Sequence, residues 1–121
     1  MTRHVLIAED DADMRALVAL TLRRDGYFVE EVRDGWALLA SLEAPNILLD
    51  LVITDIRMPG LSGLDVVERI RTKSESVPVI VMTAFGDEEA RATATRLGAV
   101  LIDKPFSMDA LRTAVCHVLR E

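Results

Sequence analysis

Acidic, hydroxyl and amine side chains occur where four short apolar runs of this sequence end. Glu9 and Asp10 follow the first of these runs, Asp55 the second, Thr83 and Ala84 the third, and Lys104 and Pro105 the fourth. Three carboxylates in one cleft repel each other, and a hard divalent cation held by oxygen atoms is the usual solution. We expect Mg²⁺, with Mn²⁺ as the alternative, because Mg²⁺ keeps waters that phosphoryl oxygens can replace.

A threonine hydroxyl and a lysine opposite the acids would suit phosphoryl transfer. This reaction requires mainly positioning and charge neutralisation, which Thr83 and Lys104 can provide for an incoming phosphoryl group. Asp55 would be the nucleophile that becomes an acyl phosphate, while Asp10 and Glu9 hold the metal ion.

Each of these residues also has an ordinary structural interpretation. Glu9, Asp10 and Asp11 could be first-turn acids of a helix, and Asp55 could form an Asx-turn. Thr83 could be a cap or edge residue, and Lys104 a surface lysine. Their joint placement at four strand ends favours the functional interpretation. His4 and His117 have no partner at ligand spacing and are interpreted as structural or surface residues.

Five strand-like runs alternate with five segments of helical periodicity. We expect strands at 4–8, 27–32, 51–54, 77–82 and 99–102, with 46–49 as a loop. We expect helices from Asp10 or Asp11 to Gly26, from about 36 to 45, and at 64–73, 86–97 and 107–118. Short connections imply βαβ units and hence a three-layer α/β fold, a five-stranded parallel sheet in the order 2-1-3-4-5 with five helices. In this order the strand ends named above converge.

Composition limits the remaining possibilities. The 121 residues suit one domain, either stand-alone or cut from a longer protein. A net charge of -6 without a basic cluster argues against nucleic acid or an anionic membrane as a direct partner. No apolar run approaches the length of a membrane span, and the single cysteine, Cys116, is compatible with a reducing cytoplasm.

Four motifs together resemble the receiver domain of bacterial two-component response regulators. They are, in chain order, VLIAEDDADMR, LDLVITDIRMPGLSGLD, PVIVMTA and IDKPF. The resemblance covers essentially the whole chain and implies a flavodoxin-like fold. The strand order 2-1-3-4-5 is itself known from this family, so the order adds no separate support.

The resemblance also implies a role for each site residue. Asp55 would accept a phosphoryl group from a sensor histidine kinase, a phosphotransfer protein or a small phosphodonor. Asp10, Asp55 and the backbone carbonyl of Arg57 would bind Mg²⁺ directly, and Glu9 would act through water. The phosphoryl oxygens would be held by Thr83, the Ala84 N–H and Lys104. The bond between Lys104 and Pro105 would be cis.

One position departs from the family pattern. Three residues before the lysine, where a Tyr or Phe is common, this chain has Leu101, which offers less volume and no hydroxyl. The inner face of the fourth helix is mostly alanine, so this helix should dock loosely. We therefore expect switching to depend more on this helix, with an output surface formed by the fourth helix, fifth strand and fifth helix. An effector domain, a downstream protein or a phosphorylation-dependent homodimer would use that surface.

Three other functions compete with this interpretation. A Mg²⁺-dependent phosphohydrolase would share the aspartyl intermediate, but residue 57 is Arg rather than a second carboxylate, so we do not expect an enzyme with separate turnover. A receiver-like module that takes no phosphate is disfavoured by the intact Asp10, Asp55, Thr83 and Lys104. A nucleotide or flavin site would need a glycine-rich loop after the first strand, which is absent.

Overall fold

The computed structural model describes residues 2–44, 48–72, 76–84 and 87–120, and strands and helices alternate along these ranges. The strands are β1 (His4–Ala8), β2 (Phe28–Val32), β3 (Leu51–Asp55), β4 (Val79–Ala84) and β5 (Val100–Lys104). The helices are α1 (Ala12–Arg24), α2 (Gly35–Glu43), α3 (Gly63–Thr72), α4 (Glu88–Arg96) and α5 (Met108–Leu119). Each predicted strand and helix is present.

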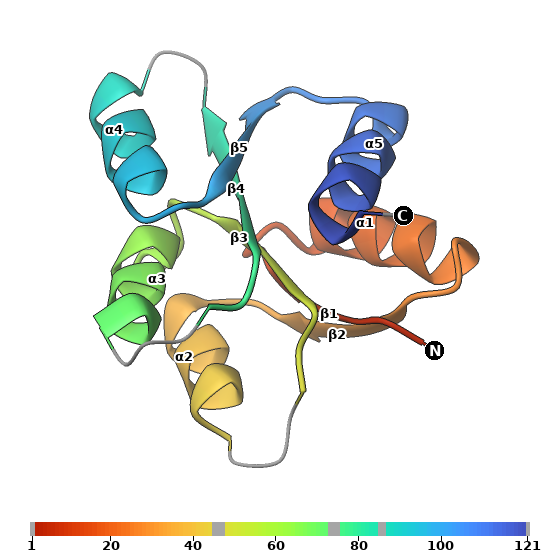
Figure 1. Ribbon diagram of the computed structural model, residues 1–121, viewed down its shortest axis with the longest axis horizontal. Helices are drawn as coiled ribbons and strands as arrows, with labels where there is room; N and C mark the ends of the chain where they lie inside the picture. The colour runs from red at the N-terminus through yellow and green to blue at the C-terminus, as the bar shows by residue number, and fades with distance from the viewer. Residues whose placement is uncertain (1, 45–47, 73–75, 85–86, 121) are drawn as a thin grey trace.

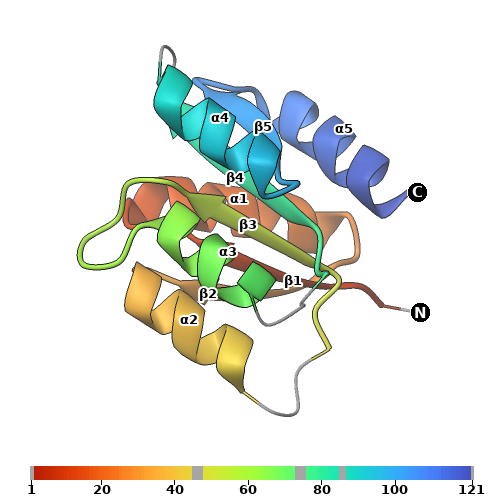
Figure 2. The same ribbon diagram turned by 60° about the vertical axis from the view of Figure 1, so that its left-hand side comes forward.

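The strands form one parallel sheet in the order β2-β1-β3-β4-β5. Helices α1 and α5 cover one face, and α2, α3 and α4 cover the other, so the molecule has three layers (Figure 1). Figure 2 shows α2, α3 and α4 side by side along one face. The predicted fold class and strand order are confirmed.

The core is divided in two by the sheet, because successive strand side chains point to opposite faces. On β1, Leu6 and Ala8 join the apolar cluster beneath α2, α3 and α4. Val5 and Ile7, which alternate with them, join the cluster beneath α1 and α5. The sheet is therefore buried on both faces, which explains the nearly continuous apolar runs.

Several predicted boundaries were wrong by one or two residues. β3, β4 and β5 continue to Asp55, Ala84 and Lys104, because ladder pairing continues to Asp55↔Met82 and Ala84↔Lys104. Three of the site positions are thus the last residues of strands rather than the first residues of loops. β4 begins at Val79, and α4 is shorter than predicted, with Asp87 as N-cap and Leu97 as C-cap. The predicted ends at 45, 73 and 86 lie outside the described residues.

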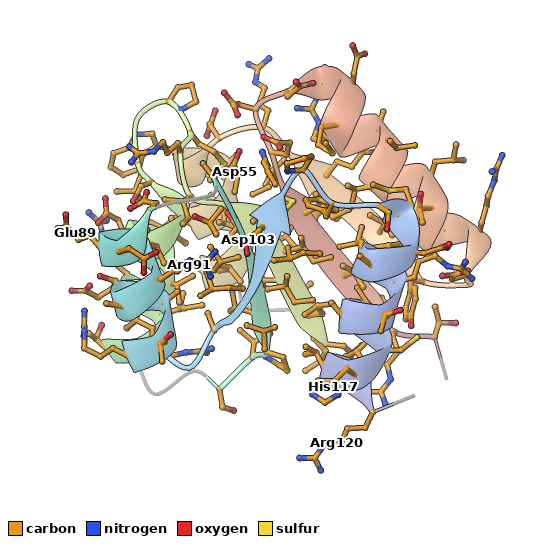
Figure 3. The ribbon with its side chains drawn as sticks, turned by 90° about the horizontal axis from the view of Figure 1, so that it is seen from above. Asp55, Glu89, Arg91, Asp103, His117 and Arg120 are labelled. Carbon is orange, nitrogen blue, oxygen red and sulfur yellow. The ribbon has the colours of Figure 1, made fainter. Side chains whose placement is uncertain are left out.

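Helix α4 has little apolar contact with the sheet. Its buried residues are Ala90 and Ala94. Its charged side chains pair with neighbouring elements: Arg91 with Asp103 on β5, and Arg96 with Glu68 on α3 at 3.4 Å. Figure 3 shows Arg91 on α4 directed toward Asp103.

Arg71 on α3 fixes the C-terminal end of α4. Its Nε donates a hydrogen bond to the carbonyl of Leu97 at 3.0 Å, and its Nη1 donates to the carbonyl of Val77 at 2.8 Å. Leu97 is the C-cap of α4, and Val77 lies just before β4. One side chain therefore joins α3, the end of α4 and the start of β4.

Candidate functional site

The carboxyl ends of β1, β3, β4 and β5 are neighbours in the sheet and carry the predicted site residues. Glu9 and Asp10 follow β1, and Asp55 ends β3. Thr83 and Ala84 end β4, and Lys104 ends β5. Figure 3 shows Asp55 at the edge where β4 and β5 also end.

Lys104 connects two of the acids. Its Nζ donates one hydrogen bond to Glu9 Oε1 and another to Asp55 Oδ2, each at 2.8 Å. Burial alone would lower the pKa of Lys104, but hydrogen bonds to Asp55 and Glu9 outweigh it and raise the pKa. The amine is therefore a stable positive charge that joins the ends of β1, β3 and β5.

Glu9, Asp10 and Asp55 form a compact carboxylate cluster. One oxygen from each lies within 4.8 Å of the others. Burial raises the pKa of Glu9 to about 7; the Lys104 hydrogen bond opposes this effect, and the neighbouring Asp55 adds to it. One lysine cannot neutralise three carboxylates, so the cluster carries more negative than positive charge. Three carboxylates whose negative charge is only partly compensated offer the hard oxygen ligands that suit a cation such as Mg²⁺.

The main chain around Asp55 is held tightly. The Thr54 hydroxyl donates to the Asp55 carbonyl at 2.9 Å, and the Gly63 N–H donates to the Ile56 carbonyl at 2.9 Å. A Cβ at position 63 would lie 2.1 Å from the Asp55 carbonyl oxygen, a separation that real Cβ atoms do not adopt. Sequence reasoning missed Thr54 and Gly63, although a glycine at the start of a predicted helix was a usable signal.

Thr83 is buried, and its hydroxyl makes only a long 3.3 Å hydrogen bond to the Ala84 carbonyl. Such a bond is weak enough for the hydroxyl to turn toward a better acceptor. Leu101 pairs with Val81 across the sheet and is partly buried against the cluster that contains Ala90 and Ala94. The bond between Lys104 and Pro105 is cis, in agreement with the expectation.

The hydrogen bonds show which of the acidic residues have the ordinary structural roles considered above. Asp11, not Asp10, is the N-cap of α1, and its Oδ1 accepts from the N–H groups of Asp13 and Met14 at 2.9 and 3.0 Å. Asp55 does accept from the Arg57 N–H in the manner of an Asx-turn, but at 3.4 Å. Its shorter contact is to Lys104. Glu9 is buried against the lysine instead of capping a helix.

The two histidines lie away from the acids. The His4 ring contacts the ring of Phe28, with centroids 4.9 Å apart. His117 is exposed on α5, as Figure 3 shows. Within the described part of the chain, Glu9, Asp10 and Asp55 form the group with metal-ligand spacing, and neither histidine belongs to it.

Arg57 makes a contact that the sequence did not suggest. Its side chain is 78% exposed, and its Nη2 donates to Asp87 Oδ2 at 2.9 Å. The other carboxylate oxygen of Asp87 accepts from the Ala90 N–H at 3.1 Å and so caps α4. The pair joins the loop after Asp55 to the start of α4 across 30 residues of sequence.

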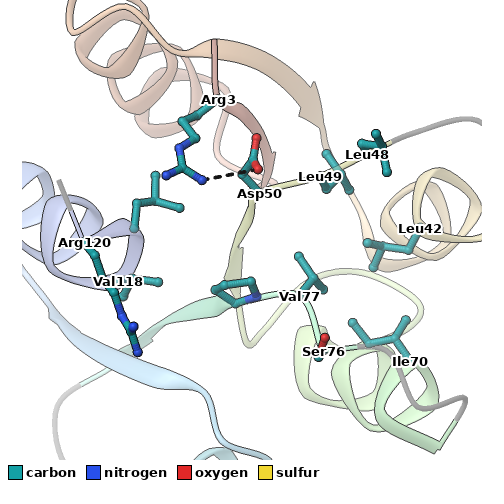
Figure 4. Close-up of a pocket in the computed structure, with 12 residues that line it drawn as sticks. Arg3, Leu42, Leu48, Leu49, Asp50, Ile70, Ser76, Val77, Val118 and Arg120 are labelled. Atoms are coloured by element: carbon teal, nitrogen blue, oxygen red, sulfur yellow. Dashed lines mark ion pairs between the residues drawn. The ribbon is translucent and has the colours of Figure 1, made fainter. Parts of the chain in front are cut away.

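A separate cavity of about 430 Å³ lies at the opposite edge of the sheet (Figure 4). Its walls combine apolar side chains, such as Leu42 and Val118, with polar and charged ones, such as Ser76 and Arg120. Its carboxylate, Asp50, pairs with Arg3 at 3.6 Å. It therefore offers no cluster of acids comparable with the one at the carboxyl edge.

A scan of family models matches residues 5–116 to the response regulator receiver domain. The chain belongs to this family. The receiver domain is 33% identical over 119 residues to the transcriptional regulatory protein FixJ of Bradyrhizobium diazoefficiens, covering 98% of this chain and 57% of that protein. It is 38% identical over 117 residues to the sensory transduction protein RegX3 of Mycobacterium tuberculosis, covering 96% of this chain and 50% of that one.

Solved structures of receiver domains have the same fold. Full-length FixJ from B. japonicum superposes with a TM-score of 0.87 at 33% identity, covering 99% of this chain and 59% of that one. The chemotaxis response regulator CheY4 of Vibrio cholerae superposes with a TM-score of 0.86 at 29% identity, covering 98% and 100% of the two chains. The receiver domain spans about half the length of the curated relatives it matches. Among the helices described, none is long and apolar enough to cross a membrane.

Proposed function

We propose that this receiver domain accepts a phosphoryl group on Asp55 in a Mg²⁺-dependent reaction and thereby switches the surface formed by α4, β5 and α5. The observation that carries the proposal is the cluster of Glu9, Asp10 and Asp55 around Lys104 at one edge of the sheet. Acids alone are common on surfaces, but here two of them are buried and share one amine.

In the proposed reaction, a carboxylate oxygen of Asp55 attacks the phosphorus of a phosphohistidine on a sensor kinase or phosphotransfer protein. The new P–O bond forms as the P–N bond breaks, and the histidine nitrogen takes the electron pair and a proton. Lys104, with its raised pKa, supplies positive charge beside the acyl phosphate. The Thr83 hydroxyl and the Ala84 N–H are the proposed donors to its remaining oxygens.

The metal site is proposed from the same cluster. Asp10, Asp55 and the Arg57 carbonyl would hold Mg²⁺ or Mn²⁺, and Glu9 would act through a water. When bound, the cation neutralises charge on the transferring phosphoryl group. The chain's own contribution is to bring the carboxylates together and to keep Glu9 buried beside them.

Intact mass spectrometry after incubation with Mg²⁺ and acetyl phosphate tests the proposal. The wild type should gain the mass of one phosphoryl group, and Asp55→Asn should gain none. Asp50→Asn is the matched control, because Asp50 lies just before β3, at the end opposite Asp55, and pairs with Arg3; it should gain the same mass as the wild type. An unchanged gain in Asp55→Asn would refute the assignment of the phosphoacceptor.

We propose a phosphoacceptor rather than a phosphohydrolase. A hydrolase would need a second carboxylate next to the nucleophile, and the corresponding side chain, Arg57, points to Asp87. Hydrolysis of p-nitrophenyl phosphate in the presence of Mg²⁺, lost in Asp55→Asn, would contradict this.

The proposed partners are a sensor histidine kinase or phosphotransfer protein upstream and an effector domain or separate protein downstream, with a phosphorylation-dependent homodimer as a further output. The names of the relatives, a transcriptional regulatory protein and a sensory transduction protein, support this order of events for this chain. The packing of Leu101 against the apolar cluster that also contains Ala90 and Ala94 of α4 supports a readout through this helix. Amide exchange that is the same in α4 with and without beryllofluoride and Mg²⁺ would contradict that readout.

A further inference from the structure

We propose that Arg57 is shared between Asp87 and the phosphoryl group on Asp55, so that the Arg57–Asp87 ion pair opposes phosphorylation and its opening releases the first turn of α4. This inference rests on the proposed function, because it needs a phosphoryl group on Asp55. It adds a positioning residue, Asp87, that lies outside the cluster of acids and Lys104.

Arg57 lies beside the proposed phosphoacceptor. Arg57 follows Asp55 by two residues, and its main-chain N–H already lies 3.4 Å from Asp55 Oδ1. Its side chain lines a cavity of about 720 Å³ between α3 and α4, whose walls include both Asp10 and Asp87. The guanidinium therefore has open space around it that extends from α4 to the proposed metal ligand Asp10.

Asp87 and a phosphoryl group differ in the negative charge that they offer to Arg57. Asp87 offers Arg57 one negative charge, in a pair whose arginine is 78% exposed, and such pairs hold their partners weakly. A phosphoryl group carries nearly two negative charges and three acceptor oxygens, which a guanidinium can bind in a bidentate manner. Arg57 will therefore leave Asp87 for a phosphoryl group within its reach.

Asp87 connects α4 to Arg57 as well as capping the helix. Its Oδ1 caps the helix through the Ala90 N–H, while its Oδ2 accepts from Arg57. Loss of Arg57 leaves the cap in place but removes the link to the loop after Asp55. Because α4 buries only Ala90 and Ala94, that link is one of the two ion pairs among the described residues, with Arg91–Asp103, that connect its N-terminal half to neighbouring elements.

Titration with beryllofluoride in the presence of Mg²⁺ tests the proposal. Trp36 is the only tryptophan and serves as the fluorescent reporter, because its indole faces Gly60 in the loop after Asp55. Asp87→Asn keeps a capping oxygen but removes the charge that competes for Arg57. It should bind beryllofluoride about two- to fivefold more tightly than the wild type, the range expected for an exposed ion pair.

The double variant makes the test specific. In Arg57→Gln the competition is absent, so adding Asp87→Asn to it should leave the affinity unchanged. Glu68→Gln removes a different ion pair of α4, the one with Arg96, and is the matched control; its affinity should equal that of the wild type. Amide exchange in the first turn of α4 should be faster in Arg57→Gln without beryllofluoride and in the wild type with it.

Two results would overturn the inference. One is an Asp87→Asn affinity equal to or weaker than that of the wild type, and the other is an equal effect of Asp87→Asn with and without Arg57. Either would leave the proposed function intact if the wild type still binds beryllofluoride. Absence of binding by the wild type would overturn the proposed function and this inference together.

Discussion

Helices α4 and α5 flank the same strand, β5, but are held to it in different ways. Helix α5 buries Leu111, Val115 and Leu119 in the core. Helix α4 buries Ala90 and Ala94, and charged pairs near its two ends and to β5 add to this small apolar contact. The apolar area removed from water is thus much larger beneath α5.

Because of this difference, α4 and α5 should differ in how easily they change position on the sheet. A leucine that leaves a packed core forfeits several kcal/mol, so α5 cannot change position at small cost. An exposed ion pair is worth less than about 1 kcal/mol and exchanges partners readily. Under the proposed function, the helix that begins just beyond Thr83 and Ala84 is therefore the one that phosphorylation of Asp55 would move, while α5 would provide a fixed reference.

The largest expected effect is on the α5 side. Leu111→Ala removes a fully buried side chain and should lower the free energy of unfolding by about 2–5 kcal/mol. Urea denaturation followed by circular dichroism measures this as a lower midpoint. A loss below about 1 kcal/mol would mean that α5 is no better anchored than α4, and the comparison would fail.

A substitution on α4 should have a smaller and more local effect. Ala94→Gly lies within the helix and should cost about 1 kcal/mol, mainly through helix propensity. Hydrogen exchange should show faster exchange in α4 and unchanged rates in α5, because little core packing is lost. Faster exchange throughout α5 would show that the two helices unfold as one unit.

The smallest effect is that of salt. At about 1 M NaCl the Debye length falls to about 3 Å, so the exposed pairs that hold α4 are screened. Amide exchange in α4 should increase severalfold relative to low salt, and that in α5 should not. Arg96→Gln, which lacks the pair with Glu68, should respond less to salt than the wild type. If the two proteins respond equally to salt, screening of the Arg96–Glu68 pair does not cause the faster exchange.

Much of the fold was predictable because local patterns and topology agree in this chain. Apolar runs between helical segments predicted the strands, and a parallel sheet then required Glu9, Asp55 and Lys104 to converge. Boundaries were less accurate, since whether β5 continues to Lys104 depends on pairing with β4 rather than on its own residues. The sequence predicted that Glu9 would lie near Lys104, 95 residues away. It did not predict that Glu9 would be buried or hydrogen-bonded to this lysine.

Other features had no local signal. The contact of Arg57 with Asp87 depends on how the loop after Asp55 approaches the start of α4. In the sequence, Arg57 falls in a predicted loop and Asp87 in the first turn of the helix predicted at 86–97, and neither position indicates the other. The need for Gly63 arises from the carbonyl of Asp55, which a helix start contacts only after folding. The alanines of α4, by contrast, did predict its shallow packing from the sequence alone.

The hydrogen bonds of Arg71 determine how α4 can move. They hold the carbonyl of Leu97, so the C-terminal end of the helix is a pivot and the N-terminal end is the free end of a lever. A helix of nine residues is about 13 Å long. A rotation of about 10° at the pivot would carry Asp87 roughly 2 Å, while Leu97 would hardly move. If Asp55 is phosphorylated as proposed, small rearrangements at that edge of the sheet would become a tilt of α4, and a partner would sense the angle of this helix rather than its distance from the sheet.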